Sequence, residues 1–146
     1  MAKTHPSTNY LYNFNTKLVD RDNFIISCCI GKTVIHVGCT DFPITSQRIA
    51  TGQLLHLKLE NVTKALLGVD IDASGIDIMK RETLKSQYLN HDITKLLTKN
   101  VYNNWDIILL LDMVEHITNV HNLFINSKQW MSYDGFIVVT APNALA

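Results

Sequence analysis

The sequence predicts an α/β fold in which helices cover both faces of a doubly wound, mainly parallel sheet. Short apolar runs rich in Ile, Val and Leu alternate along the chain with segments of helical periodicity. Such runs are typical of strands buried on both faces. With 146 residues, of which 47% are hydrophobic, the chain has enough apolar side chains for the core of one compact domain.

Strands and helices are expected to alternate in βαβ units. The expected strands are residues 33–37, 65–69, 87–90, 105–111 and 136–141. The expected helices are about 16–30, ended by Gly31; one that Pro43 helps to begin; one between 53 and 64; one from Asp72 or Ser74 onward; and one after Thr118, stopped by Tyr133-Asp134-Gly135. Residues 1–31 thus form an N-terminal segment with a leading helix, and residues 32–146 form the α/β domain.

The spacing of apolar residues also predicts which side of a helix faces the sheet. In the last helix, residues at three- and four-residue steps share one face: Val120, Leu123, Phe124, Ser127 and Met131. In the helix that begins near Asp72, that face holds Ile76, Met79 or Lys80, and Leu84. His56, in the helix between 53 and 64, is expected on the helix surface.

Composition argues against several classes of partner. Thirteen Lys and Arg balance thirteen Asp and Glu, so no net charge favours nucleic acid or an anionic membrane surface. The longest apolar runs are far shorter than a membrane span. The cysteines, at 28, 29 and 39, lack the spacing of a disulfide framework or a zinc site, and the histidines lack ligand spacing with them. We therefore expect a cytoplasmic domain with no metal, nucleic-acid partner or membrane partner.

Residues that could bind a ligand or take part in catalysis follow each predicted strand. They are Gly38 after the first strand, Asp70 after the second, Asp92 after the third, Asp112 with Glu115-His116 after the fourth, and Pro142-Asn143 after the fifth. Each is a weak signal alone, because an Asp after a strand more often caps a helix. Ligands of parallel sheets bind beyond the carboxyl ends of the strands, so these residues are expected to converge on one cleft.

Two nucleotide-type ligands compete for this cleft. A dinucleotide fold needs the spacing G-x-G-x-x-G so that the diphosphate can sit on a helix N-terminus. Here Thr40 and Pro43 stand at the second and third glycine positions, and Asp41 would bring a carboxylate close to the diphosphate. S-adenosylmethionine has no phosphate and carries an ammonium and a sulfonium. The loop therefore favours the methyl donor.

Four motifs together resemble the class I S-adenosylmethionine-dependent methyltransferases. They are 34–39, 67–71, 105–108 leading to Glu115-His116, and 134–136 leading to Pro142-Asn143. The likeness spans about residues 32–143 and is greatest to the branch with Glu-His and Pro-Asn motifs. It implies a Rossmann-like methyltransferase fold, S-adenosylmethionine as cofactor, and methyl transfer to an acceptor that we expect to be a small molecule or a sugar.

The resemblance also implies a place for each site residue. The methionine part of the cofactor would contact His36, Val37, Gly38 and Cys39, with Asp112 nearby. Asp70 would hold the ribose hydroxyls, Ile71 would pack on adenine, and Asp92 and Ile93 would lie at the adenine edge. The family often has an acidic residue at the position of His36, so Asp41 or Asp112 is expected to receive the ammonium.

His116, assisted by Glu115, is the candidate general base for an oxygen acceptor, because histidine exchanges protons near neutral pH and this one follows a strand end. The alternatives are structural. His116 would then bond to backbone in the first turn of a helix, and Glu115 would complement the helix dipole. Cys39 is expected to be a small packing residue and not a nucleophile.

Three functional classes follow: an active methyltransferase, a fragment or pseudoenzyme that binds the cofactor without activity, and, disfavoured by the loop, a dinucleotide-dependent oxidoreductase. The family's sheet normally continues past the fifth strand, whereas this sequence stops at Ala146. Strand 136–140 would then be an edge that is apolar on both faces. We expect it to pair with a second copy, giving a homodimer, or with the missing segment.

Overall fold

The computed structural model describes residues 19–83, 85–95 and 104–142. Within these residues, parallel strands form one five-stranded sheet in the order β3-β2-β1-β4-β5. The strands are β1 (Thr33–Val37), β2 (Ala65–Asp70), β3 (Gln87–Asn90), β4 (Trp105–Leu111) and β5 (Met131–Thr140). The order reverses between β1 and β4, where the ligand site of a doubly wound sheet is expected.

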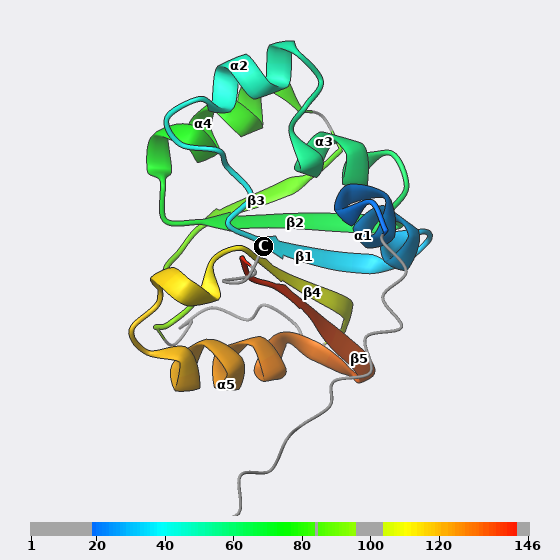
Figure 1. The fold of residues 1–146 in the computed structure, drawn as a ribbon, viewed down its shortest axis with the longest axis vertical. Coiled ribbons are helices and arrows are strands. Elements are labelled where there is room, and N and C mark those ends of the chain that lie inside the picture. Colours follow the sequence, from blue (N-terminus) through cyan, green and yellow to red (C-terminus); the bar gives the residue numbers. More distant parts are fainter. Residues whose placement is uncertain (1–18, 84, 96–103, 143–146) are drawn as a thin grey trace, which may run out of the picture.

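Helices lie on both faces of this sheet (Figure 1). They are α1 (Arg21–Cys29), α2 (Thr45–Ala50), α3 (Leu55–Glu60), α4 (Ala73–Glu82), the 3₁₀ turn η1 (Val114–His116) and α5 (Val120–Trp130). Figure 1 shows α5 on one face and α1, α3 and α4 on the other, with α2 next to α4. The predicted α/β fold with helices on both faces is confirmed.

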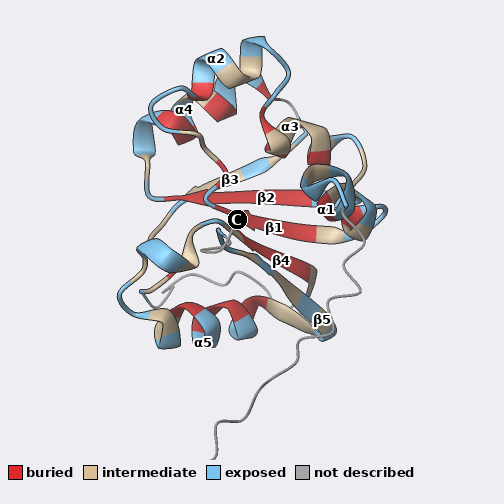
Figure 2. Ribbon diagram, viewed as in Figure 1, coloured by how far each residue is buried: buried red, intermediate tan, exposed pale blue. Residues whose placement is uncertain are grey.

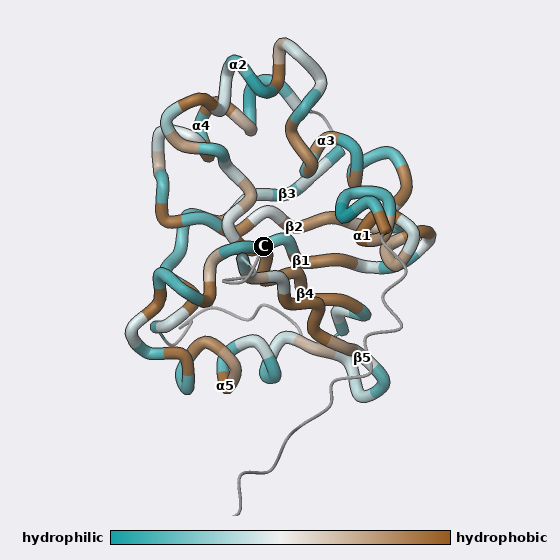
Figure 3. Tube along the Cα trace, in the orientation of Figure 1, coloured by the Kyte–Doolittle hydropathy of each residue, from teal (hydrophilic) through white to brown (hydrophobic). Residues whose placement is uncertain are grey.

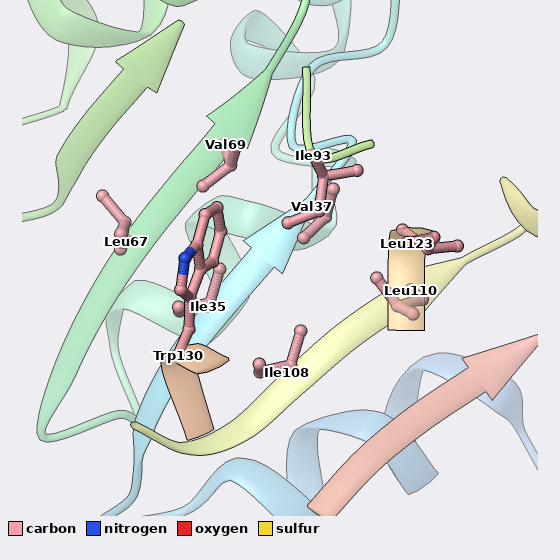
Figure 4. Packing of buried hydrophobic residues seen from close by; sticks show 9 residues of the cluster. All are labelled: Ile35, Val37, Leu67, Val69, Ile93, Ile108, Leu110, Leu123 and Trp130. Carbon is pink, nitrogen blue, oxygen red and sulfur yellow. The ribbon is translucent and has the colours of Figure 1, made fainter. Parts of the chain in front are cut away.

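The two faces of the sheet carry separate hydrophobic clusters. Burial is concentrated in the central strands β1, β2 and β4, which are also strongly apolar (Figures 2 and 3). The cluster under α5 comprises Ile35, Val37, Leu67, Val69, Ile93, Ile108, Leu110, Leu123 and Trp130 (Figure 4). The cluster under α1 and α3 comprises Ile25, Cys29, Val34, Leu59, Leu66, Ile107 and Leu109. Alternate residues of one strand thus serve opposite faces, as expected for a fully covered strand.

The last helix and strand differ from the sequence expectation. The helix ends at Trp130, and the chain enters β5 at once, so Met131 is a strand residue and Tyr133-Asp134-Gly135 does not stop the helix. Met131 pairs with Trp105, and the register shifts before Phe136 pairs with Ile107. Gly135 permits this irregularity, because a Cβ there would lie 2.9 Å from the carbonyl oxygen of Trp105.

Two side chains were placed on the wrong side of their helices. Phe124 is 37% exposed, and the buried residues of α5 are Leu123, Asn126, Ser127 and Trp130. His56, expected on the surface, is fully buried because α3 turns it toward β1 and β3. The inward face of α4 is confirmed for Ile76 and Met79, whereas Leu84 lies outside the described residues.

The leading helix begins at Arg21, where the carboxylate of Asp20 accepts a hydrogen bond from the backbone N–H of Asn23 and caps it. Gly31, with φ of +68°, follows the helix as expected. Residues 16–18 of the expected helix lie outside the described part. Every helix within residues 19–83, 85–95 and 104–142 is too short or too polar to span a bilayer.

Candidate functional site

Two adjoining cavities open where β1, β2 and β4 end. The larger, of about 590 Å³, lies toward α1 and the loop before α2. The smaller, of about 400 Å³, lies toward the loops after β2 and β3. Gly38, Met113 and His116 line both cavities, so the two form the lobes of one cleft.

All ten predicted cofactor residues line this cleft. The larger lobe has His36, Gly38, Cys39, Asp41 and Asp112 in its wall. The smaller lobe has Val37, Gly38, Asp70, Ile71, Asp92 and Ile93. The structure therefore brings together residues from four separate strand ends, as the parallel topology requires.

Gly38 stands at the junction of the two lobes. Its φ of +71° is a left-handed conformation that favours glycine, and its N–H donates to the carbonyl oxygen of Val69 at 2.8 Å. A Cβ at this position would meet no described atom within 4 Å. The missing side chain thus leaves open space between the lobes, where a ligand can approach the backbone closely.

Asp70 organises the loop around Gly38. One carboxylate oxygen, Oδ2, accepts hydrogen bonds from the N–H of Thr40 at 3.0 Å and from its hydroxyl at 2.9 Å. The other, Oδ1, accepts from the N–H of Asp72 at 2.9 Å. A carboxylate has about four acceptor positions, so Asp70 has one left for a ligand hydroxyl.

The smaller lobe combines an apolar surface with an acidic edge. Ile71 is 74% exposed and offers an uncovered apolar side chain. Asp92 accepts hydrogen bonds from the hydroxyl and N–H of Thr94, and these bonds hold the pKa of its carboxyl below the usual value. Ile93 is buried and belongs to the hydrophobic cluster under α5.

A polar cluster at the larger lobe was not predicted. Arg21 of α1 pairs with Asp112, which follows β4, and also donates to the hydroxyl of Thr140 at the end of β5. That hydroxyl in turn donates to Asp112 at 2.8 Å. Asp112 has a left-handed backbone, with φ of +48°. Arg21 and Asp112 are 91 residues apart, so no local sequence pattern relates them.

The charge of Asp41 is also balanced by an arginine. Nε of Arg48 lies 3.4 Å from a carboxylate oxygen of Asp41, and both side chains are more than 40% exposed. Arg48 lines the same lobe. This pair weakens the electrostatic argument against a diphosphate ligand, whereas the missing glycines at Thr40 and Pro43 still argue against one.

His116 lies at the junction of the lobes, at the end of η1, and its backbone N–H donates to the carbonyl oxygen of Met113. Within the part of the chain that the structure describes, its ring makes no hydrogen bond, so both ring nitrogens face solvent or a ligand. Glu115 is exposed and lines neither lobe. His116 can therefore contact a ligand in either lobe, whereas Glu115 is part of neither lining.

Two buried histidines adjoin the larger lobe. Burial, together with the positive charge of Arg21, lowers the pKa of His36 to about 4. Burial also lowers the pKa of His56, and the neighbouring His36 acts in the same direction. Cys39 is buried as well, which raises the pKa of its thiol and disfavours a nucleophilic thiolate.

The free energy of unfolding is expected to fall as pH decreases from about 6.5 toward 4. His36 stays neutral in the folded protein down to a pKa of about 4, whereas the unfolded chain takes up its proton near 6.5. The unfolded state therefore binds more protons in this window, and acid favours unfolding. The lowered pKa values of Asp92 and Asp106 act in the same direction, but only below about pH 5, where the unfolded carboxyls begin to take up protons. Urea unfolding across this window measures the slope.

The exposed His121 provides the control for this measurement. A His121→Gln variant should keep the pH slope, and a His56→Leu variant should lose part of it. A stability that is constant between pH 6.5 and 4 would contradict the assignment of two neutral buried histidines.

Comparison with known proteins finds methyltransferases. The chain is 23% identical over 124 residues to the ubiquinone biosynthesis O-methyltransferase of Glaesserella parasuis, a match that covers 80% of this chain and 48% of that protein. No protein-family model matches.

Solved structures have the same fold. A TehB-like S-adenosylmethionine-dependent methyltransferase from Corynebacterium glutamicum superposes with a TM-score of 0.62 and 16% identity, covering 81% of this chain and 59% of that one. Phosphoethanolamine N-methyltransferase 1 from Haemonchus contortus, in complex with phosphoethanolamine and S-adenosylhomocysteine, gives 0.60 and 18%, covering 82% and 25%. The chain thus spans about half the length of the curated relative and less than two thirds of these structures.

Proposed function

The chain has the Rossmann-like fold of the class I S-adenosylmethionine-dependent methyltransferases, and from this we propose that its cleft binds S-adenosylmethionine for methyl transfer to a small-molecule or sugar acceptor. One observation carries the proposal. A smaller lobe with an apolar surface and an acidic edge meets a larger lobe with charged side chains at Gly38, where no side chain fills the space.

The residues of each lobe match one half of this cofactor. In the smaller lobe, Asp70 has one acceptor position for a ribose hydroxyl, and Ile71 offers an apolar surface for adenine. In the larger lobe, Arg21 and Asp112 provide opposite charges for a zwitterionic amino acid end. We propose these residues, with His36, Val37, Gly38, Cys39, Asp41, Asp92 and Ile93, as the cofactor site.

The cofactor supplies the reactive methyl group, so the protein's part is to align the acceptor and to remove its proton. We assign proton removal to a ring nitrogen of His116, which lies where the lobes meet and makes no hydrogen bond to another described side chain. Glu115, outside both lobes, would act on His116 only from a distance. The expected cytoplasmic location remains a prediction from the cysteines.

A His116→Ala variant is expected to lower turnover by roughly 10²- to 10⁴-fold, the usual contribution of a general base, without weakening cofactor binding. The assay follows formation of S-adenosylhomocysteine with a panel of phenols and sugars. His121→Ala, on the exposed surface of α5, is the matched control. Full turnover by the His116→Ala variant would exclude His116 as the base.

A second candidate is a domain that binds the cofactor without catalysis. The position of Glu115 favours this candidate, because the expected partner of His116 in catalysis is exposed and lines neither lobe. Binding of S-adenosylhomocysteine with no turnover on any acceptor would support it.

We also propose a homodimer through the edge of β5. Of the described strands, only β4 pairs with β5, and Phe136 and Val139 expose 45% and 43% of their surface. An apolar edge strand offers unpaired backbone groups to another chain. Light scattering should give a dimer, and a Val139→Lys variant should be monomeric. A monomer at high concentration whose β5 amides are nevertheless protected from exchange would contradict self-pairing.

A further inference from the structure

Two buried histidines form a pair behind the larger lobe. The rings of His36 on β1 and His56 on α3 stack with centroids 5.4 Å apart and an interplanar angle of 15°. Their Nδ1 atoms are 3.2 Å apart, which is a hydrogen-bond distance. His36 is 5% exposed and His56 is fully buried, so one ring must donate to the other.

The second nitrogen of His56 decides the direction of this bond. Its Nε2 is buried and has no hydrogen-bond partner among the described residues. If His36 donated, His56 would need its proton on Nε2, leaving a buried N–H without an acceptor. If His56 donates from Nδ1, its Nε2 carries only a lone pair, which is the less costly atom to bury. A charged ring on either residue also places a proton on that Nε2.

The surroundings hold the His56 ring in this orientation. The ring of Tyr88 lies tilted against it, with centroids 5.2 Å apart, and the Tyr88 hydroxyl is 2.7 Å from the hydroxyl of Thr83. Gly68 makes room for Tyr88, since a Cβ there would lie 2.7 Å from its ring. The packing of Tyr88 against His56 therefore hinders the His56 ring from turning over.

The donor direction fixes the proton of His36. When His56 donates to Nδ1 of His36, the proton of His36 is on Nε2, the remaining polar atom of a ring that lines the larger lobe. We propose that His56 is a positioning residue that makes His36 an uncharged Nε2–H donor for the carboxylate of the cofactor's methionine end. This proposal rests on the proposed function, since it assumes that the larger lobe receives that end.

The other charges of the lobe agree with this assignment. Arg21 places a second donor group in the same lobe, so two donors are available to a carboxylate. An N–H donor cannot accept from an ammonium, which leaves Asp112 and Asp41 for that group. In the class I methyltransferases that the chain resembles, this position often holds an acidic residue, which accepts hydrogen bonds. His36 would instead donate one.

The protonation of both rings can be read directly. In the free protein labelled with ¹⁵N, long-range proton–nitrogen spectra at neutral pH should show His36 protonated on Nε2 and His56 protonated on Nδ1. The opposite tautomers, or a charged His36, would overturn the proposal. This readout requires neither ligand binding nor activity.

Two variants of His56 test the consequence for binding. His56→Leu removes the donor, and His56→Asn keeps an amide N–H near the place of Nδ1. Calorimetry would compare S-adenosylhomocysteine with 5′-methylthioadenosine, which lacks the amino acid end. His56→Leu should weaken the first about tenfold and leave the second unchanged, as expected when a hydrogen bond to a charged group is lost, and His56→Asn should bind both normally.

The outcomes separate this proposal from the proposed function. If the unaltered protein binds S-adenosylhomocysteine and His56→Leu weakens both ligands equally or neither, the role of His56 is wrong and the cofactor site stands. If the unaltered protein binds neither ligand, the proposed cofactor site is rejected. The proposed recognition of the carboxylate by His36 is then rejected as well. If His56→Leu does not fold, the tautomers of the unaltered protein decide the case.

Discussion

Replacement of Leu123 by alanine is expected to lower the free energy of unfolding by about 2 to 5 kcal/mol. Leu123 is fully buried on α5 and belongs to the cluster that joins this helix to β1, β2 and β4 (Figure 4). Its truncation removes apolar contacts and leaves a cavity that a packed sheet cannot fill by relaxing. Single domains are stable by only about 5 to 15 kcal/mol, so this loss is a large part of the total.

Ile125, two residues along the same helix and 43% exposed, provides the matched control. Ile125→Ala should change stability by less than about 1 kcal/mol, since surface substitutions rarely exceed that size. Urea unfolding of both variants measures the difference. Equal losses in the two variants would mean that α5 does not pack on the sheet through Leu123.

Replacement of Asp70 by asparagine is expected to weaken binding of S-adenosylhomocysteine by roughly 10- to 100-fold, the effect of losing a hydrogen bond to a charged group. An asparagine replaces one acceptor oxygen by a donor. Whichever way the amide turns, a donor then faces the N–H of Thr40 or of Asp72. The loop beside Gly38 loses a contact, and the ribose loses its charged acceptor.

Asp77 on the exposed side of α4 gives the control. Asp77→Asn removes the same charge without touching the cleft, so its affinity should equal that of the unaltered protein. Calorimetry on both variants, with folding checked by circular dichroism, makes the comparison. Undiminished affinity in Asp70→Asn would remove Asp70 from the proposed site.

The fold was largely predictable because buried parallel strands leave a strong local signal. The bounds of β1, β3 and β4 agree with the expected runs, since a polar residue precedes each run and a glycine or a polar residue follows it. The start of β5 was missed because the preference of Met131 for the helix face was outweighed by pairing with Trp105. Periodicity placed Leu123 correctly but not Phe124, because the sheet covers only part of the helix circumference.

The site was predictable only where chain topology fixes it. Residues that follow strands meet at one edge of any parallel sheet, which is why Gly38, Asp70 and Asp92 could be grouped from sequence. Arg21 could not be assigned to the site from the sequence, because its partner Asp112 is 91 residues away. Likewise, the burial of His56 depends on Tyr88 from another element, and no pattern within α3 reveals it.

Calorimetric titration of the purified chain with S-adenosylhomocysteine, and separately with NAD, tests the central claim most directly. The cleft predicts one molecule of S-adenosylhomocysteine bound per chain and no binding of NAD, because the loop from Gly38 to Pro43 lacks the glycines that hold a diphosphate. Binding of NAD without S-adenosylhomocysteine, or of neither compound, would contradict the proposal.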